Sequence, residues 1–180
     1  FYKRIENPIN LAQTRGSSGI FTYDNTGKKA DVVGLELETR LNLIDEDKSN
    51  LSINLNATKM WFNQDLLEEF QYNNQTESDL QGASDFIVNT SISFSNNQEN
   101  EFVATLAGNY SSNKIYALGA PEDFANSAAL YNDEIIEKGF VTLDLVLSKK
   151  LTEKLSVKLT GRNIINPSIK QSQKVKNLSN

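Results

Sequence analysis

Three charged residues at alternate positions, Glu36, Glu38 and Arg40, form the group best suited to acid–base chemistry. In a β-strand this spacing puts all three on one face, because successive side chains point to opposite faces. The 180-residue chain has no histidine and no cysteine, and no serine stands in an arrangement that would activate it. We therefore expect no enzyme, and interpret the three residues as part of a polar wall.

The acidic run Asp45, Glu46 and Asp47 could in principle bind a divalent cation through its carboxylates. It lacks the glycine and the later glutamate at the spacing of a calcium-binding loop. We interpret it as a solvated turn, and expect neither a metal site nor a cofactor. The net charge of −5 and the pI near 4.9 argue against a nucleic-acid surface, which needs clustered lysine and arginine.

The segment that carries the first group, residues 32–44, alternates between apolar and polar positions throughout. Its apolar positions are Val33, Leu35, Leu37, Leu41 and Leu43. A helix would scatter the charges around its circumference, so the period of two predicts a β-strand. The segment is longer than a usual globular strand of about five or six residues. It matches the roughly 9–11 residues with which a tilted strand crosses a bilayer core.

The same alternation recurs along the chain, and the connections between the repeats follow a rhythm. The further strands are expected at residues 1–5, 51–62, 86–95, 101–117, 141–148 and 155–162. The connections alternate short and long, at residues 45–50, 63–83, 96–100, 118–138 and 152–153. Outer-membrane barrels have short periplasmic turns and long extracellular loops. We predict an all-β fold: an antiparallel transmembrane β-barrel meander, with about seven strands of a larger barrel.

Aromatic residues on the apolar positions fall at two levels. Trp61, Phe86 and Tyr110 lie next to long connections, and Phe94 and Phe102 flank a short one. Two such levels are typical of the girdles at the two membrane interfaces. Lys59 falls among the apolar positions near a strand end, where its long side chain can reach the interface. The alternative is a soluble β-sandwich, whose strands alternate too but are shorter and lack the rhythm of connections.

Three stretches are similar to one known family. They are residues 1–9 (Phe-Tyr-Lys-Arg-Ile-Glu-Asn-Pro-Ile), residues 30–38 (Ala-Asp-Val-Val-Gly-Leu-Glu-Leu-Glu), and residues 143–167 with their Asn163-Ile164-Ile165-Asn166 turn. The second matches an Ala-x-x-x-Gly-x-Glu strand and is the most specific. Together the stretches resemble the C-terminal part of the β-barrel domain of a TonB-dependent outer-membrane receptor.

The resemblance implies a 22-stranded barrel in the outer membrane of a Gram-negative bacterium, plugged by an N-terminal domain. Such a receptor imports a scarce nutrient with TonB-supplied energy: a siderophore, a cobalamin-like compound, an oligosaccharide or a peptide. Residues 1–180 would be a fragment of the barrel domain, without the plug and the TonB box. The alternative is a receptor-like barrel that serves as a structural or assembly subunit of a larger outer-membrane complex.

The expected partners are outer-membrane lipid, the rest of the barrel, its plug, TonB through the missing N-terminal region, and a surface lipoprotein or other outer-membrane subunits. Polar-face residues would contact substrate or plug: Glu36, Glu38, Arg40, Asn54, Asn56, Asn89, Asn109, Asp144, Lys158 and Arg162. Two loop segments, 66–70 and 124–131, would either contact a ligand or pack only against their neighbours.

Overall fold

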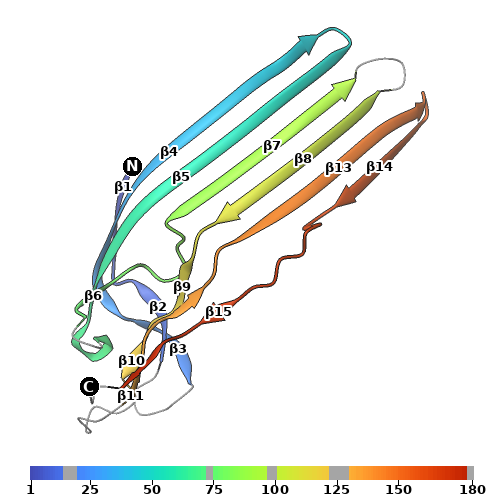
Figure 1. The fold of residues 1–180 in the computed structure, drawn as a ribbon. Helices are drawn as coiled ribbons and strands as arrows, with labels where there is room; N and C mark the ends of the chain where they lie inside the picture. The colour runs from blue at the N-terminus through green and yellow to red at the C-terminus, as the bar shows by residue number, and fades with distance from the viewer. Residues whose placement is uncertain (14–19, 72–74, 97–100, 122–129, 178–180) are drawn as a thin grey trace.

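The computed structural model describes residues 1–13, 20–71, 75–96, 101–121 and 130–177. Most of them belong to one antiparallel sheet in which each strand follows its neighbour along the chain (Figure 1). In sheet order the strands are β1 (Tyr2–Glu6), β4 (Gly27–Glu46), β5 (Ser49–Leu66), β7 (Phe86–Asn96), β8 (Phe102–Ser111), β13 (Phe140–Thr152) and β14 (Leu155–Gly161). This meander confirms the prediction of about seven strands.

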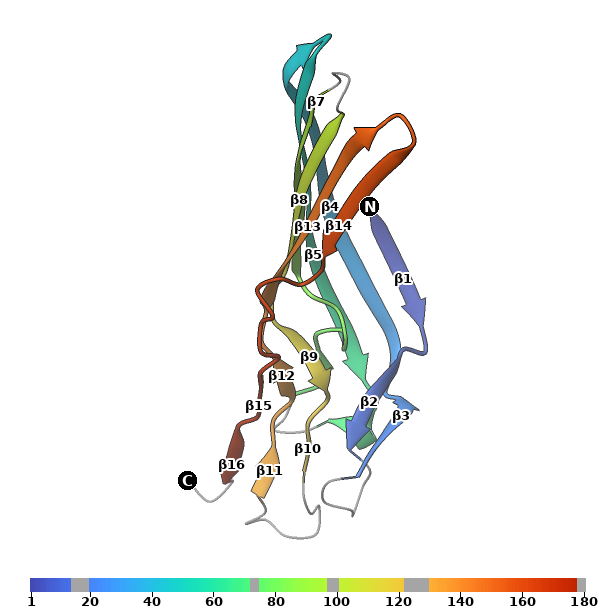
Figure 2. The same cartoon turned by 90° about the vertical axis from the view of Figure 1, so that its right-hand side faces the viewer.

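Short strands gather at the end of the sheet opposite the short hairpin turns (Figure 2). They are β2 (Ile9–Gln13) with β3 (Phe21–Asn25); β9 (Lys114–Ala117), β12 (Ile135–Glu137) and β15 (Gln171–Ser172); β10 (Ala120–Pro121), β11 (Leu130–Asn132) and β16 (Val175–Asn177); and β6 (Glu77–Ser78), which pairs with β5. We call this end the cap: the described parts of residues 7–26, 64–85, 112–139 and 163–177. In the described ranges, no helix has the length and apolar character to span a membrane.

Several predicted boundaries were wrong at the cap end. β4 and β5 extend well beyond 32–44 and 51–62, so the predicted loop 63–83 begins only after Leu66. The predicted strand 101–117 is two strands, because β8 ends at Ser111 and β9 joins a different sheet. The predicted loop 118–138 and the residues after 162 both contain short strands. Within the predicted loop 63–83, residues Glu68–Phe70 form a single 3₁₀ turn, η1.

The break after β8 has a local cause in close backbone packing. A Cβ atom on Gly139 would lie 2.4 Å from the carbonyl oxygen of Ser111, so only glycine allows the chain to enter β13 here. The Gly139 amide donates a hydrogen bond to Oδ1 of Asn113 (2.8 Å). These contacts turn residues 112–113 away from the long sheet, which allows β9 to pair with β12 instead.

Among the described residues, no second layer covers the apolar face of the long sheet. Leu35, Leu37 and Leu41 are 67%, 58% and 50% exposed. In a sandwich these leucines would pack against another sheet, and no described strand takes that place. Leucine at this exposure in a row of strands is typical of a surface that faces lipid. The fully buried apolar cluster lies instead in the cap, where Ala12, Leu66, Ile115 and Leu118 pack together.

Candidate functional site

The polar face of the long sheet aligns predicted site residues in rows that cross the strands. Glu38 pairs with Asn56, Asn56 with Asn89, and Asn89 with Asn109. The row continues to Thr142 on β13, whose Oγ1 accepts a hydrogen bond from Nδ2 of Asn109 (3.4 Å). Three amide side chains therefore stand side by side on three adjacent strands.

A second row lies next to it, toward the short turns. Arg40 pairs with Asn54 and Asn54 with Ser91, and Nδ2 of Asn54 donates to the Ser91 hydroxyl (3.3 Å). Both rows line one open hollow with a volume of about 500 Å³. Six of the ten predicted site residues meet there: Glu38, Arg40, Asn54, Asn56, Asn89 and Asn109.

The hollow is suited to hydrogen bonding. Each amide offers both a donor and an acceptor, so a row of them can bind hydroxyl or amide groups without a fixed charge. The charges of Glu38 and Arg40 largely compensate each other, because Nη2 of Arg40 lies 2.8 Å from Oε1 of Glu38. Both side chains are well exposed, at 76% and 60%, so the pair adds less than about 1 kcal/mol of stability.

The other four predicted residues lie outside the hollow. Glu36 is one row further toward the cap, opposite Thr58. Asp144 accepts a hydrogen bond from the backbone amide of Asn163 (2.7 Å), so it holds the turn that follows β14. Lys158 stands opposite Ser148 on the last strand, and Arg162 follows the end of β14.

The apolar face carries the five predicted interface aromatics. The rings of Phe86 and Tyr110 are 6.3 Å apart, and those of Phe94 and Phe102 are 6.5 Å apart. Trp61 is opposite Val33 and about half exposed. From Phe86 to Phe94 is nine positions of β7, close to the roughly 9–11 residues of a membrane-crossing strand. The rings therefore lie at two levels along the strands, and their assignment to the two membrane interfaces stays a prediction.

Lys59 bends toward the strand end, as predicted for a lysine on the apolar face. Its ammonium group forms an ion pair with Asp85, which directly precedes β7. The same carboxylate accepts a hydrogen bond from the Ser112 hydroxyl. The ammonium also lies 5.8 Å from the centre of the Trp61 ring, a favourable cation–π geometry.

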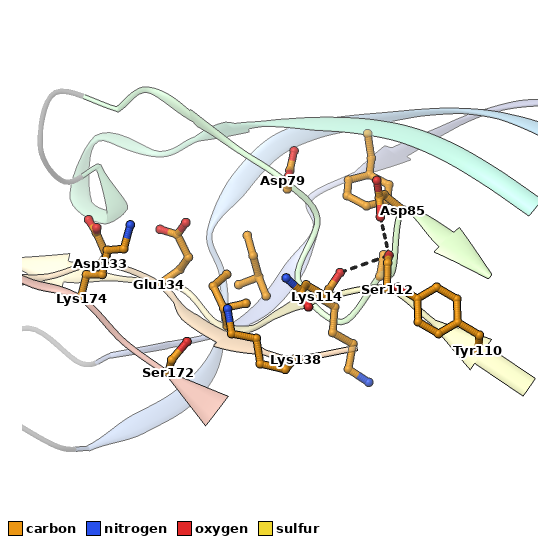
Figure 3. A pocket seen from close by; sticks show the side chains of 15 residues that line it. Asp79, Asp85, Tyr110, Ser112, Lys114, Asp133, Glu134, Lys138, Ser172 and Lys174 are labelled. Carbon is orange, nitrogen blue, oxygen red and sulfur yellow. Dashed lines mark hydrogen bonds between the residues drawn. The ribbon is translucent and has the colours of Figure 1, made fainter. Parts of the chain in front are cut away.

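Sequence reasoning missed a second concave site, a cavity of about 600 Å³ in the cap (Figure 3). Its charged residues come from four separate connections and from β9, so no periodic spacing in the sequence indicates the site. Of the two loop segments proposed for ligand contact, residues 66–70 instead help to build the cap: Leu66 belongs to the buried cluster, and Phe70 packs against it. The other segment, 124–131, lies mostly outside the described residues.

A single-layer meander with a polar face, an apolar face and two aromatic levels defines part of a transmembrane β-barrel. The family model described as "TonB dependent receptor-like, beta-barrel" matches residues 1–164, and the chain belongs to this family. It is therefore a receptor barrel and not an enzyme, and the family typically resides in the outer membrane of Gram-negative bacteria. No curated protein and no solved structure matches the chain.

Proposed function

We propose that the protein containing this chain imports a scarce nutrient across the outer membrane of a Gram-negative bacterium, with energy supplied by TonB. The observation that supports this most is the family match over residues 1–164. The sheet agrees with it, because one of its faces is polar and the other is apolar. In such a barrel the apolar face contacts lipid and the polar face lines the lumen. The long connections at the cap are then extracellular and the short turns periplasmic.

The polar hollow is the part of this lumen wall that meets cargo or plug. Its row of asparagines can exchange hydrogen bonds with successive partners, since each amide both donates and accepts. Glu36, Asp144, Lys158 and Arg162 add charged groups above and beside the hollow. Those side chains that lie toward the short turns would contact the plug.

The two outer strands of the sheet require further strands. Within the described residues, β1 and β14 each have one partner, so their other edges expose unpaired backbone groups. Transfer of each such unpaired group from water into hydrocarbon costs roughly 2–7 kcal/mol. The remaining strands of a larger barrel would cover both edges and, together with a plug, complete the receptor.

Uptake by living cells tests this function. Cells that lack the full-length protein and cells that lack TonB should lose uptake of the same nutrient, with no further loss when both are absent. Labelled ferric siderophore, cobalamin, oligosaccharide and tripeptides form the panel. If removal of the protein affects no uptake that depends on TonB, the import function is wrong. If the protein then co-purifies with a surface lipoprotein, the scaffold alternative replaces it.

A further inference from the structure

The cavity in the cap collects side chains from connections that are distant in sequence. Asp79 and Asp85 come from the segment between β6 and β7, Lys138 follows β12, and Lys174 follows β15. In Figure 3, Asp79 and Asp85 lie on one side and Lys138 and Ser172 on the other. Asp133 and Glu134 lie beside Lys174, so carboxylates and ammonium groups are interspersed around one space of about 600 Å³.

Some of these charges already have partners. Asp85 pairs with Lys59 and with the Ser112 hydroxyl. Lys114 pairs with Glu137, with 3.0 Å between Nζ and Oε1. In the described part of the chain, no ion pair involves Asp79, Lys138 or Lys174. One anionic and two cationic groups therefore remain for a ligand.

Asp79 has the strongest need for a cationic partner. Burial of its carboxyl group raises its pKa, and the nearby negative charges of Asp85 and Glu134 raise it further. Each of these effects disfavours the carboxylate form. A positive group brought into the cavity would offset the repulsion from Asp85 and Glu134 and would stabilise the carboxylate form of Asp79.

Apolar side chains complete the lining. Ile115 is buried, Ile136 packs against the apolar cluster of the cap, and Phe62 also borders the cavity. A ligand that fits must therefore combine a positive group, a negative group and an apolar part. Burial of about 25 cal/mol per Å² of apolar surface would add to the ionic contacts.

We propose that this cavity binds a short peptide with free termini, its amino group toward Asp79 and its carboxylate toward Lys138 and Lys174. This rests on the proposed import function and names its substrate class. Four carboxylates against three ammonium groups line the cavity, a balance that does not attract an anionic iron chelate. A neutral oligosaccharide would leave the charged groups partly desolvated and without a partner. A peptide satisfies both signs of charge and the apolar lining.

The test uses the full-length receptor, immobilised in detergent. It is exposed to a mixture of tripeptides made from the natural amino acids, and to the same mixture acetylated and amidated. Mass spectrometry of the retained peptides should show enrichment only from the mixture with free termini. Calorimetry with the most enriched tripeptide should then show at least a tenfold loss of affinity in Asp79→Asn and in Lys138→Gln.

Two matched controls lie at the other end of the sheet. Asp47→Asn and Lys154→Gln remove the same charges from the short turns and should leave the affinity unchanged. Equal retention of free and blocked peptides would overturn the proposal, as would an equal loss of affinity in cavity and control variants. If uptake of another nutrient still depends on both the receptor and TonB in that case, the import function stands and only the peptide assignment fails.

Discussion

The sheet and the cap achieve stability in opposite ways. In the sheet, Leu37 stands 58% exposed on a single layer, and its apolar surface is covered only when lipid surrounds it. In the cap, Leu118 is fully buried within a small core of its own. The two regions of the chain are therefore adapted to different surroundings. Hydrocarbon covers the apolar face of the sheet, while the cap buries its apolar groups as a water-soluble domain does.

Polar groups follow the same division. In the cap, Asn10 donates a hydrogen bond from Nδ2 to Oε1 of Gln64 (2.8 Å) and another to Thr26, and all three are fully buried. On the sheet, the amide rows are open to the hollow, where water can replace any missing partner. A lost hydrogen bond should therefore matter far more in the cap than on the sheet.

The largest effect is expected from Leu118→Ala. It leaves a cavity in a packed core, so the free energy of unfolding of the full-length protein should fall by about 2–5 kcal/mol. Leu37→Ala should cost much less, because lipid chains fill the space that the side chain leaves. Urea titration in lipid vesicles measures both. Equal losses at the two positions would mean that the sheet is covered by protein instead of lipid.

Leu37→Arg sharpens the assignment of the apolar face. A charge placed near the middle of a bilayer should cost roughly 2–4 kcal/mol. The control is Glu36→Gln on the neighbouring position, where the side chain faces the lumen and should change the unfolding free energy little. The same vesicle titration applies. An alanine penalty at Leu37 as large as the arginine penalty would contradict a lipid-facing position.

Gln64→Met tests the polar network of the cap. The change removes the acceptor of Asn10 and leaves a buried amide with one partner fewer, at a cost of about 1–3 kcal/mol. Asn42→Met is the matched change on the exposed polar face of the sheet, and it should lower the free energy of unfolding by only a few tenths of the cost at Gln64. The difference in unfolding midpoint between the two variants is the measurement. No difference would show that the cap is as open to water as the sheet.

The smallest effect depends on pH and concerns Asp79. Its pKa is higher in the folded protein than in the unfolded chain, because the carboxyl group is buried and faces Asp85 and Glu134. Its protonated form is therefore favoured by folding, and this contribution is lost as pH rises through the folded-state pKa. At neutral pH, Asp79→Asn should unfold at a higher urea concentration than the parent protein. This difference in unfolding midpoint should vanish below the unfolded-state pKa. An advantage that is constant from pH 3 to pH 8 would contradict this.

The sheet was predictable because each of its strands separates lipid from a wet face, which imposes a period of two that is readable in residues 32–44. The cap was not, because its elements are stabilised by contacts between distant segments. The amide of Leu118 donates to the carbonyl of Leu11 (2.8 Å), and nothing near either residue signals the other. For the same reason the amide rows could be proposed from the sequence, whereas the cavity with Asp79, Lys138 and Lys174 could not.

The aromatic level next to the cap coincides with the end of β14, the last strand of the long sheet. Trp61 is opposite Val33, Phe86 is opposite Lys59, and Tyr110 is opposite Val88, so the aromatic level next to the cap shifts by two residues per strand toward the short turns. The membrane boundary therefore cuts diagonally across the tilted strands. Continued over two more strands, it passes Leu143 on β13 and reaches Gly161 on β14. β14 ends at that residue, so the irregular backbone that follows emerges where water is available to solvate it.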